Sequence, residues 1–363
     1  RQRQMCIRDR FIHTTNRNVT DWPEMTDTTE QIDEKLHTEI NRFTAMWKSI
    51  AEKFHCPIIQ NNFEMPLYRL LGSRDAWDIH GRTNFLTRLN EAFYAYAREN
   101  ESFYIHDLNF VSADYGLKEW LNPLFWNMYK YAMCFEAIPS FAFSVSHIIK
   151  TIFGKNKKAL ALDLDNTLWG GVVGDDGVDG IEIGQETGVS QSYYEFQTYV
   201  KQLKSLGIVL TVCSKNDHEN AIAGLNHPEG ALRPDDFVII KANWENKDRN
   251  IAETAAELNI LPDSIVFADD NPAEREIVRT QIKGAAIPDM DGVENYITTI
   301  DRSGFFEVTT FSEDDLKRNE MYKKNALRAA EMASFGDYND YLKSLEMHAV
   351  IDDFIPVYLA RIT

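Results

Sequence analysis

Two acidic side chains directly follow a short apolar run near the middle of the chain. The run covers residues 159–162 and ends at Asp163, and Asp165 stands two positions further on. An unbroken apolar run of this kind is typical of a strand that is buried on both faces of a parallel sheet. Because ligands of open α/β sheets bind at the carboxyl ends of the strands, both carboxylates are expected to lie at a site of chemistry.

A serine and a lysine stand at similar positions further along the chain. The apolar run 207–213 ends at Ser214, and Asn216 follows two residues later. Lys247 stands at the expected start of a helix, because apolar residues follow it at helical spacing. Each of these candidate residues therefore lies where a strand or loop gives way to a helix.

A second acidic pair, Asp269 and Asp270, follows the apolar run 264–268. Asn271 is then the expected N-cap of a helix, with a proline at the first helical position and Glu274 completing a capping box. An isolated Asp-x-Asp is usually a turn or a solvated pair, and the other groups each have a similarly plain structural interpretation. Four such groups, all at strand ends, are not expected to occur together by coincidence.

This order of aspartate pair, serine, lysine and second aspartate pair resembles the haloacid dehalogenase (HAD) phosphatase superfamily. The resemblance implies that Asp163 is a nucleophile that forms an aspartyl-phosphate. It implies that Asp165 first protonates the leaving oxygen and then deprotonates the hydrolytic water. The phosphoryl oxygens would be bound and neutralised by protein groups, because phosphoryl transfer mainly requires positioning and charge neutralisation. The implied phosphate-binding residues are Thr167, Ser214, Asn216 and Lys247, of which Ser214 and Lys247 also count as catalytic.

The resemblance also implies a Mg²⁺ cofactor. Two carboxylates alone would repel a phosphate, and Mg²⁺ prefers oxygen ligands. The implied ligands are Asp163, the backbone carbonyl of Asp165, and Asp270 or Asp269.

Longer motifs narrow the resemblance to the FkbH-like branch of HAD subclass IIIC. They are Leu-Asp-Leu-Asp-Asn-Thr-Leu-Trp-Gly-Gly-Val-Val-Gly at 162–174, Ser-Lys-Asn at 214–216, Asn-Trp at 243–244 and the stretch 267–275. The gaps from Thr167 to Ser214 and from Ser214 to Lys247 have room for only a hairpin, a helix or two, and a strand. We therefore expect an α/β protein with a Rossmann-like, capless HAD core and a parallel sheet, preceded by a second, truncated α/β domain.

Members of this branch are associated with polyketide and related biosynthesis. Their type activity removes a phosphate from 1,3-bisphosphoglycerate and loads the glyceryl group onto an acyl carrier protein. The resemblance thus implies a small phosphorylated substrate and a carrier-protein partner, with Cys213 as a candidate acyl acceptor. The alternative for Cys213 is a buried strand cysteine that acts as a small hydrophobe. Plain hydrolysis of a small phosphate ester and partner binding without catalysis also stay open as functions.

Composition limits the partners. The formal net charge of −18 argues against nucleic acid or an anionic membrane surface. Acidic carrier proteins would need a local basic patch, for which Lys155, Lys157 and Lys158 are the candidates. Four scattered cysteines suit a reducing cytoplasm. The most apolar stretch, residues 138–153, is broken by polar residues and is not expected to span a membrane.

The 363 residues suggest about two domains, and we expect four segments in all. Residues 1–10 are interpreted as a non-native leader, and residues 155–300 as the phosphotransfer core. Residues 11–151 alternate helices, at 29–54 and 86–98, with strands, at 56–59 and 103–105, as in an α/β domain. This part resembles a partial SGNH-hydrolase-like domain that lacks the serine block. Residues 301–363 are expected to form a truncated helical element, in which Ser312 caps a helix through Leu316, Met321 and Leu327.

Overall fold

The computed structural model describes residues 10–310, 312–313 and 317–325. Of the expected leader, only Arg10 is among the described residues. Of the expected C-terminal element, Leu316 and residues 326–363, which include Leu327, lie outside them. The described chain divides into two compact units. The N-terminal unit comprises residues 10–156 with Glu307–Thr310, and the C-terminal unit comprises Lys157–Phe306 with the described residues after 311.

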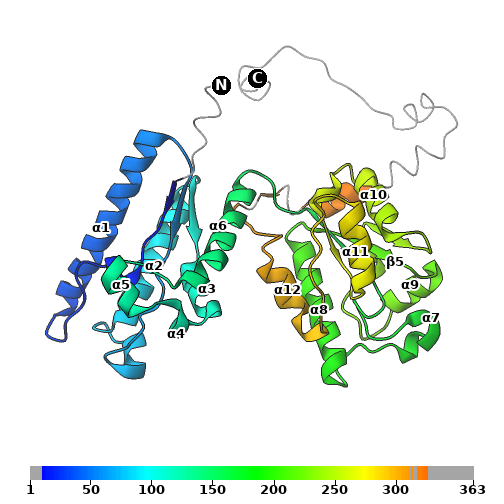
Figure 1. Cartoon of the computed structure of the whole chain (residues 1–363), viewed down its shortest axis with the longest axis horizontal. Helices are drawn as coiled ribbons and strands as arrows, with labels where there is room; N and C mark the ends of the chain where they lie inside the picture. Colours follow the sequence, from blue (N-terminus) through cyan, green and yellow to red (C-terminus); the bar gives the residue numbers. More distant parts are fainter. Residues whose placement is uncertain (1–9, 311, 314–316, 326–363) are drawn as a thin grey trace, which may run out of the picture. The chain divides into compact units, whose positions relative to one another are not determined.

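The N-terminal unit is built on a parallel sheet in the order β1-β2-β3. Its strands are β1 (Arg10–Ile12), β2 (Ile58–Asn61) and β3 (Phe103–His106). Side chains on one face of this sheet form an apolar core with α1 and α2. On the other face, Phe11 and His106 contact Phe141 of α6. Figure 1 shows α1 and α6 on opposite sides of the strands. The helices are α1 (Thr29–Phe54), α2 (Arg82–Glu99), α3 (Leu108–Tyr115), α4 (Leu117–Trp120), α5 (Pro123–Tyr129) and α6 (Ile138–Ile152).

The strand expected at residues 56–59 lies two positions further along, because polar side chains continue it. Gln60 accepts a hydrogen bond from Trp47 Nε1 at 2.9 Å, and Asn61 donates one to the carbonyl of Thr14 at 2.7 Å. Buried amides with such partners are tolerated inside a sheet. Periodicity of apolar residues could not reveal these partners.

The C-terminal unit contains a four-stranded parallel sheet in the order β6-β5-β4-β7. The strands are β4 (Ala159–Leu162), β5 (Val209–Ser214), β6 (Ile239–Ala242) and β7 (Ile265–Ala268). One face packs against α10 (Lys247–Glu257) and α11 (Pro272–Gln281). The other packs against α8 (Gly188–Ser205), α9 (His218–Leu225) and α12 (Tyr296–Arg302). The predicted α/β class with parallel strands is confirmed.

The register of this sheet brings the candidate residues to one edge. Leu162 pairs with Val212 on one side and with Ala268 on the other, so β4, β5 and β7 end at nearly the same level. Between β4 and β5 the chain forms only α7 (Val173–Asp176), a 3-10 turn and α8. The edge is therefore free of a separate cap domain within this connection, as predicted.

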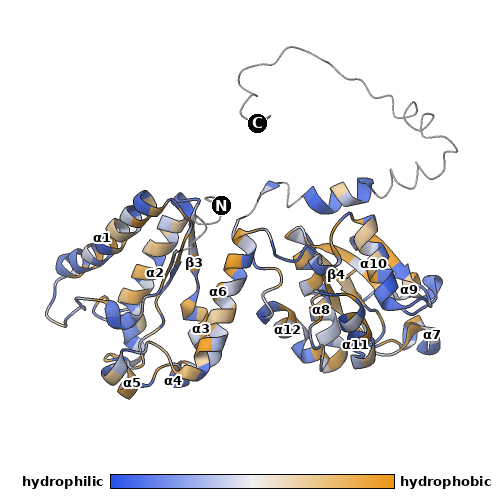
Figure 2. Cartoon of the chain, turned by 45° about the horizontal axis from the view of Figure 1, so that its top comes forward, coloured by the Kyte–Doolittle hydropathy of each residue, from blue (hydrophilic) through white to orange (hydrophobic). Residues whose placement is uncertain are grey.

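None of the described helices is long and apolar enough to cross a membrane. The most apolar of them, α6, mixes apolar and polar residues along its length (Figure 2).

Candidate active site

A buried ammonium group lies between two buried carboxylates at the carboxyl edge of the sheet. Asp163 directly follows β4, and Asp269 directly follows the neighbouring β7. Lys247, the first residue of α10, places its Nζ 2.8 Å from Asp163 Oδ2 and 2.6 Å from Asp269 Oδ2. Burial alone would lower the pKa of Lys247, but the two carboxylates raise it above its ordinary value. The lysine therefore stays charged.

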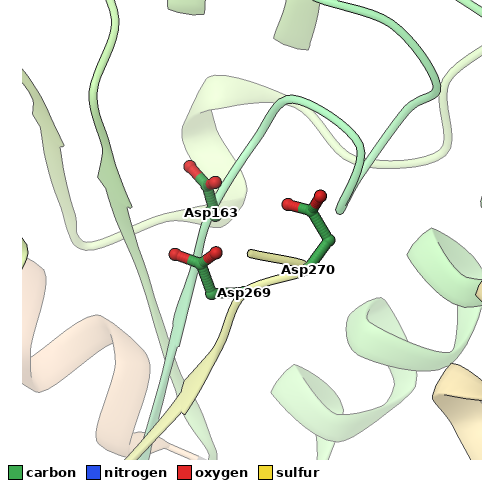
Figure 3. Close-up of side chains that lie close together, drawn as sticks. All are labelled: Asp163, Asp269 and Asp270. Carbon is green, nitrogen blue, oxygen red and sulfur yellow. The ribbon is translucent and has the colours of Figure 1, made fainter. Parts of the chain in front are cut away.

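The second oxygen of Asp163 is short of partners. Its Oδ1 is buried and has no hydrogen-bond partner among the described residues. One oxygen each of Asp163, Asp269 and Asp270 lie within 4.8 Å of one another (Figure 3). Burial first, and then the charge of Asp163, raise the pKa values of Asp269 and Asp270. This oxygen-rich cluster needs more positive charge than Lys247 supplies, and its donor set fits a hard divalent cation such as Mg²⁺.

Asp165 accepts hydrogen bonds at both of its carboxylate oxygens. Its Oδ1 accepts hydrogen bonds from Trp169 Nε1 at 2.9 Å and from the backbone N–H of Val173 at 3.0 Å. Its Oδ2 accepts a hydrogen bond from Asn216 Nδ2 at 2.9 Å. Burial raises the pKa of Asp165 against the effect of the hydrogen bonds from Val173 and Trp169. Asn166, with a left-handed φ of 55°, turns the chain after it, a conformation that asparagine tolerates better than most residues.

The four predicted phosphate-binding residues gather at this edge, but three of them already have carboxylate or backbone partners, Lys247 with Asp163 and Asp269 as described above. Thr167 is buried and accepts a hydrogen bond from the backbone N–H of Asp270 at 3.2 Å. Asn216 is buried and donates to Asp165. Ser214 is the last residue of β5 and is buried too. Direct phosphate binding by these residues stays a prediction.

Cys213 belongs to the opposite face of the sheet from the apolar side chain of Val212. It lies in the apolar cluster beneath α10, and its thiol donates to the carbonyl of Lys247 at 3.6 Å. Burial raises the pKa of the Cys213 thiol far above its ordinary value. These surroundings favour the interpretation as a small buried hydrophobe.

The predicted basic patch is divided between the two units. Lys155 belongs to the N-terminal unit, whereas Lys157 and Lys158 belong to the C-terminal unit. The ammonium group of Lys157 donates to the carbonyls of Asp263 and Gly284.

The loop that carries Asp269 and Asp270 contains one confirmed and one wrong prediction. Asn271 is the N-cap of α11, and its side chain accepts a hydrogen bond from Ala273 N at 2.9 Å. The capping box is wrong, because the carboxylate of Glu274 instead accepts from Lys215 Nζ at 2.7 Å. The lysine, which lies in the loop after β5, competes for the glutamate from outside the helix.

Two residues that serve this site were not singled out by the sequence. Trp169 contributes its indole N–H to Asp165, and Arg275 donates to the carbonyls of Asp269 at 2.9 Å and Asp270 at 2.7 Å. Both residues fall inside the motifs quoted above. The position of a tryptophan or an arginine within a motif does not show whether its side chain contacts the site, packs in the core or lies on the surface.

Comparison with solved structures identifies a similar chain. It is the N-terminal part of the protein BF1531 from Bacteroides fragilis, whose crystal structure is described as containing a phosphatase domain complexed with Mg. The two chains are 31% identical, the match covers 85% of this chain and 82% of that one, and the TM-score is 0.77. Neither a family model nor a curated protein matches the chain.

Proposed function

Since this chain belongs to the same family as the phosphatase-domain part of BF1531, we propose that it is a Mg²⁺-dependent phosphatase. The observation that carries the proposal is the buried Asp163, whose Oδ2 pairs with Lys247 while its Oδ1 lacks a partner among the described residues. Such an arrangement pairs one carboxylate oxygen with an ammonium group and leaves the other oxygen available to a divalent cation and a phosphoryl group.

Asp163 and Asp270, with the backbone carbonyl of Asp165, are the proposed Mg²⁺ ligands. Asp269 is less suited, because Lys247 occupies its Oδ2 and the backbone N–H of Asn271 donates to its Oδ1 at 2.8 Å. When bound, the ion neutralises charge on the phosphoryl group and thereby lets this anionic group approach the carboxylate of Asp163.

The proposed reaction proceeds in two steps at Asp163. One carboxylate oxygen of Asp163 forms a bond to phosphorus while the bond from phosphorus to the leaving oxygen breaks, and Asp165 gives that oxygen a proton. Water then attacks phosphorus and loses a proton to Asp165, while the bond to Asp163 breaks and inorganic phosphate is released. Lys247 supplies positive charge beside Asp163 throughout.

We extend the proposal to the HAD superfamily and its FkbH-like branch, on the strength of the motifs at 162–174, 214–216 and 267–275. On this proposal the substrate is a glyceryl phosphate such as 1,3-bisphosphoglycerate, and an acyl carrier protein receives the glyceryl group. The burial of Cys213 favours a second candidate, plain hydrolysis of a small phosphate ester, because a buried thiol of raised pKa is a poor acyl acceptor.

One experiment tests the activity and then separates the two candidates. Phosphate release is measured with p-nitrophenyl phosphate and with 1,3-bisphosphoglycerate, in Mg²⁺ and in excess EDTA. Release that requires Mg²⁺ supports the phosphatase, and no release from either substrate in Mg²⁺ counts against it. Intact mass spectrometry with peptide mapping then distinguishes a glyceryl adduct on Cys213, which means acyl transfer, from phosphate release without an adduct, which means hydrolysis.

A further inference from the structure

Both oxygens of Asp165 accept hydrogen bonds from two separate segments of the chain. Trp169, in the loop that follows β4, and Val173, the first residue of α7, donate to one oxygen, and Asn216, in the loop that follows β5, donates to the other. Trp169 and Asn216 are themselves 1% and 4% exposed, so neither side chain is free to move away. A carboxyl group fixed at both oxygens keeps one orientation instead of sampling several rotamers.

The fold also makes room for the indole of Trp169. A Cβ atom on Gly224 of α9 would lie 2.8 Å from two ring atoms of Trp169. Atoms this close would force the ring or the helix to shift. Glycine at this position therefore lets the indole pack against α9 with its N–H directed at Asp165.

We propose that Trp169 and Asn216 are positioning residues that hold the carboxyl group of Asp165 for proton transfer to the leaving oxygen. This inference rests on the proposed phosphatase function. Proton transfer requires the donor and acceptor oxygens to approach within about 2.6–3.2 Å. A displacement of about 1 Å can cost about a hundredfold in rate, so two hydrogen bonds that fix the acid have a measurable effect.

The effect depends on the leaving group. An alcohol or phenol with a high pKa needs a proton as its bond to phosphorus breaks, whereas a dinitrophenolate leaves without one. A mispositioned Asp165 therefore slows phosphorylation of Asp163 by phenyl phosphate much more than by 2,4-dinitrophenyl phosphate. Loss of general stability would slow both substrates equally.

The test uses the full chain with Mg²⁺ and compares Trp169→Phe and Asn216→Leu with the wild type. The measured quantity is kcat/KM over a series of aryl phosphates, because it reports the first chemical step and excludes hydrolysis of the aspartyl-phosphate. We expect kcat/KM for phenyl phosphate to fall at least about tenfold, with a change below about threefold for 2,4-dinitrophenyl phosphate. The two variants act on different oxygens, so one remains informative if the other fails to fold.

Trp47→Phe is the matched control. Trp47 is 1% exposed like Trp169, and its Nε1 also donates to a polar side chain, that of Gln60, at 2.9 Å, but in the N-terminal unit. It should leave the leaving-group dependence unchanged. An equal loss for every substrate in folded Trp169→Phe and Asn216→Leu would overturn the positioning role. A wild type without Mg²⁺-dependent turnover on any of the substrates would instead overturn the proposed function itself.

Discussion

Lys247 is a cation that two buried carboxylates share. Its side chain is only 4% exposed, and those of Asp163 and Asp269 are 9% and 0% exposed. Removing one partner of a buried ion pair is strongly destabilising, because the remaining charge is left in a poorly solvated place. The residue thus connects the stability of the C-terminal unit with the charge balance of the site.

Lys247→Met should lower the free energy of unfolding of the C-terminal unit by about 3–5 kcal/mol at neutral pH. The pKa of Asp269 is already raised by burial, and in the variant the folded state takes up protons more readily than the unfolded state. Stability should therefore recover as the pH falls, and added Mg²⁺ should restore part of it. Denaturant unfolding at several pH values measures this.

Lys241→Met is the control for that variant. Lys241 pairs with Glu253 and Glu257, whose side chains are 45% and 51% exposed, so its loss should cost less than about 1 kcal/mol. Equal losses of unfolding free energy in Lys247→Met and Lys241→Met would contradict the conclusion that Lys247 balances buried negative charge.

Individual residues were predictable where strand position determines them. Asp163, Ser214 and Asp269 lie at one edge of the sheet because its parallel strands end there, and a sequence shows where apolar runs stop. Partners from other segments, such as Asn216 for Asp165, depend on side-chain directions that a sequence does not contain. The position of Cys213 could have been predicted from the alternation of side chains along a strand. Neighbouring residues point to opposite faces of the sheet, so Cys213 lies on the other face from Val212.

At the scale of elements, a side chain of α11 stabilises the turn between β7 and α11. Arg275 is buried, and one of its guanidinium nitrogens donates to the carbonyls of both Asp269 and Asp270. Groups that orient metal ligands in this way are often worth ten- to a hundredfold in metal affinity. The helix therefore supports the proposed Mg²⁺ site through the backbone of its ligands.

Arg275→Met should weaken Mg²⁺ binding by about ten- to a hundredfold, because the two carbonyls lose their common donor and the acidic loop loosens. Isothermal titration with Mg²⁺ alone measures the affinity. Arg279→Met, on the same helix, removes an exposed pair with Glu276 and should leave the affinity unchanged. An unchanged affinity in folded Arg275→Met would show that the loop does not need this support.

The existence of the elements was easier to predict than their ends. The helix expected at 29–54 begins and ends as predicted, because Thr28 and Gln31 form a capping box next to a long apolar face. The helix expected at 86–98 instead begins at Arg82. Its first turn carries no apolar residue before Phe85, so periodicity could not locate its start.

At the scale of the whole molecule, the two compact units have separate cores and separate titrating groups. Glu64 in the N-terminal unit is 2% exposed and accepts hydrogen bonds from the hydroxyl of Thr15 and the backbone N–H of Asn16. Burial raises the pKa of Glu64 to about 7 from 4.5. The stability that its proton contributes is fully present below about pH 4.5 and is lost as the pH rises through about 7.

Glu64→Gln should make the N-terminal unit more stable than in the wild type by about 3 kcal/mol at pH 8, because the amide keeps an acceptor oxygen without the buried charge. The difference should shrink towards zero near pH 4.5. Hydrogen exchange in β2 measures it, with exchange in β5 as the internal control. Equal stability of the two proteins at pH 8 would mean that Glu64 is not destabilised by burial.

The central claim is that Asp163 accepts the phosphoryl group, and rapid acid quench followed by peptide mapping tests it most directly. Wild-type protein mixed with Mg²⁺ and 2,4-dinitrophenyl phosphate should show a transient phosphoryl adduct on the peptide that contains Asp163. Asp163→Asn, which keeps the size of the side chain, should show no adduct and turn over at least about a thousandfold more slowly. An adduct on another residue, or unchanged phosphate release in Asp163→Asn, would contradict the mechanism.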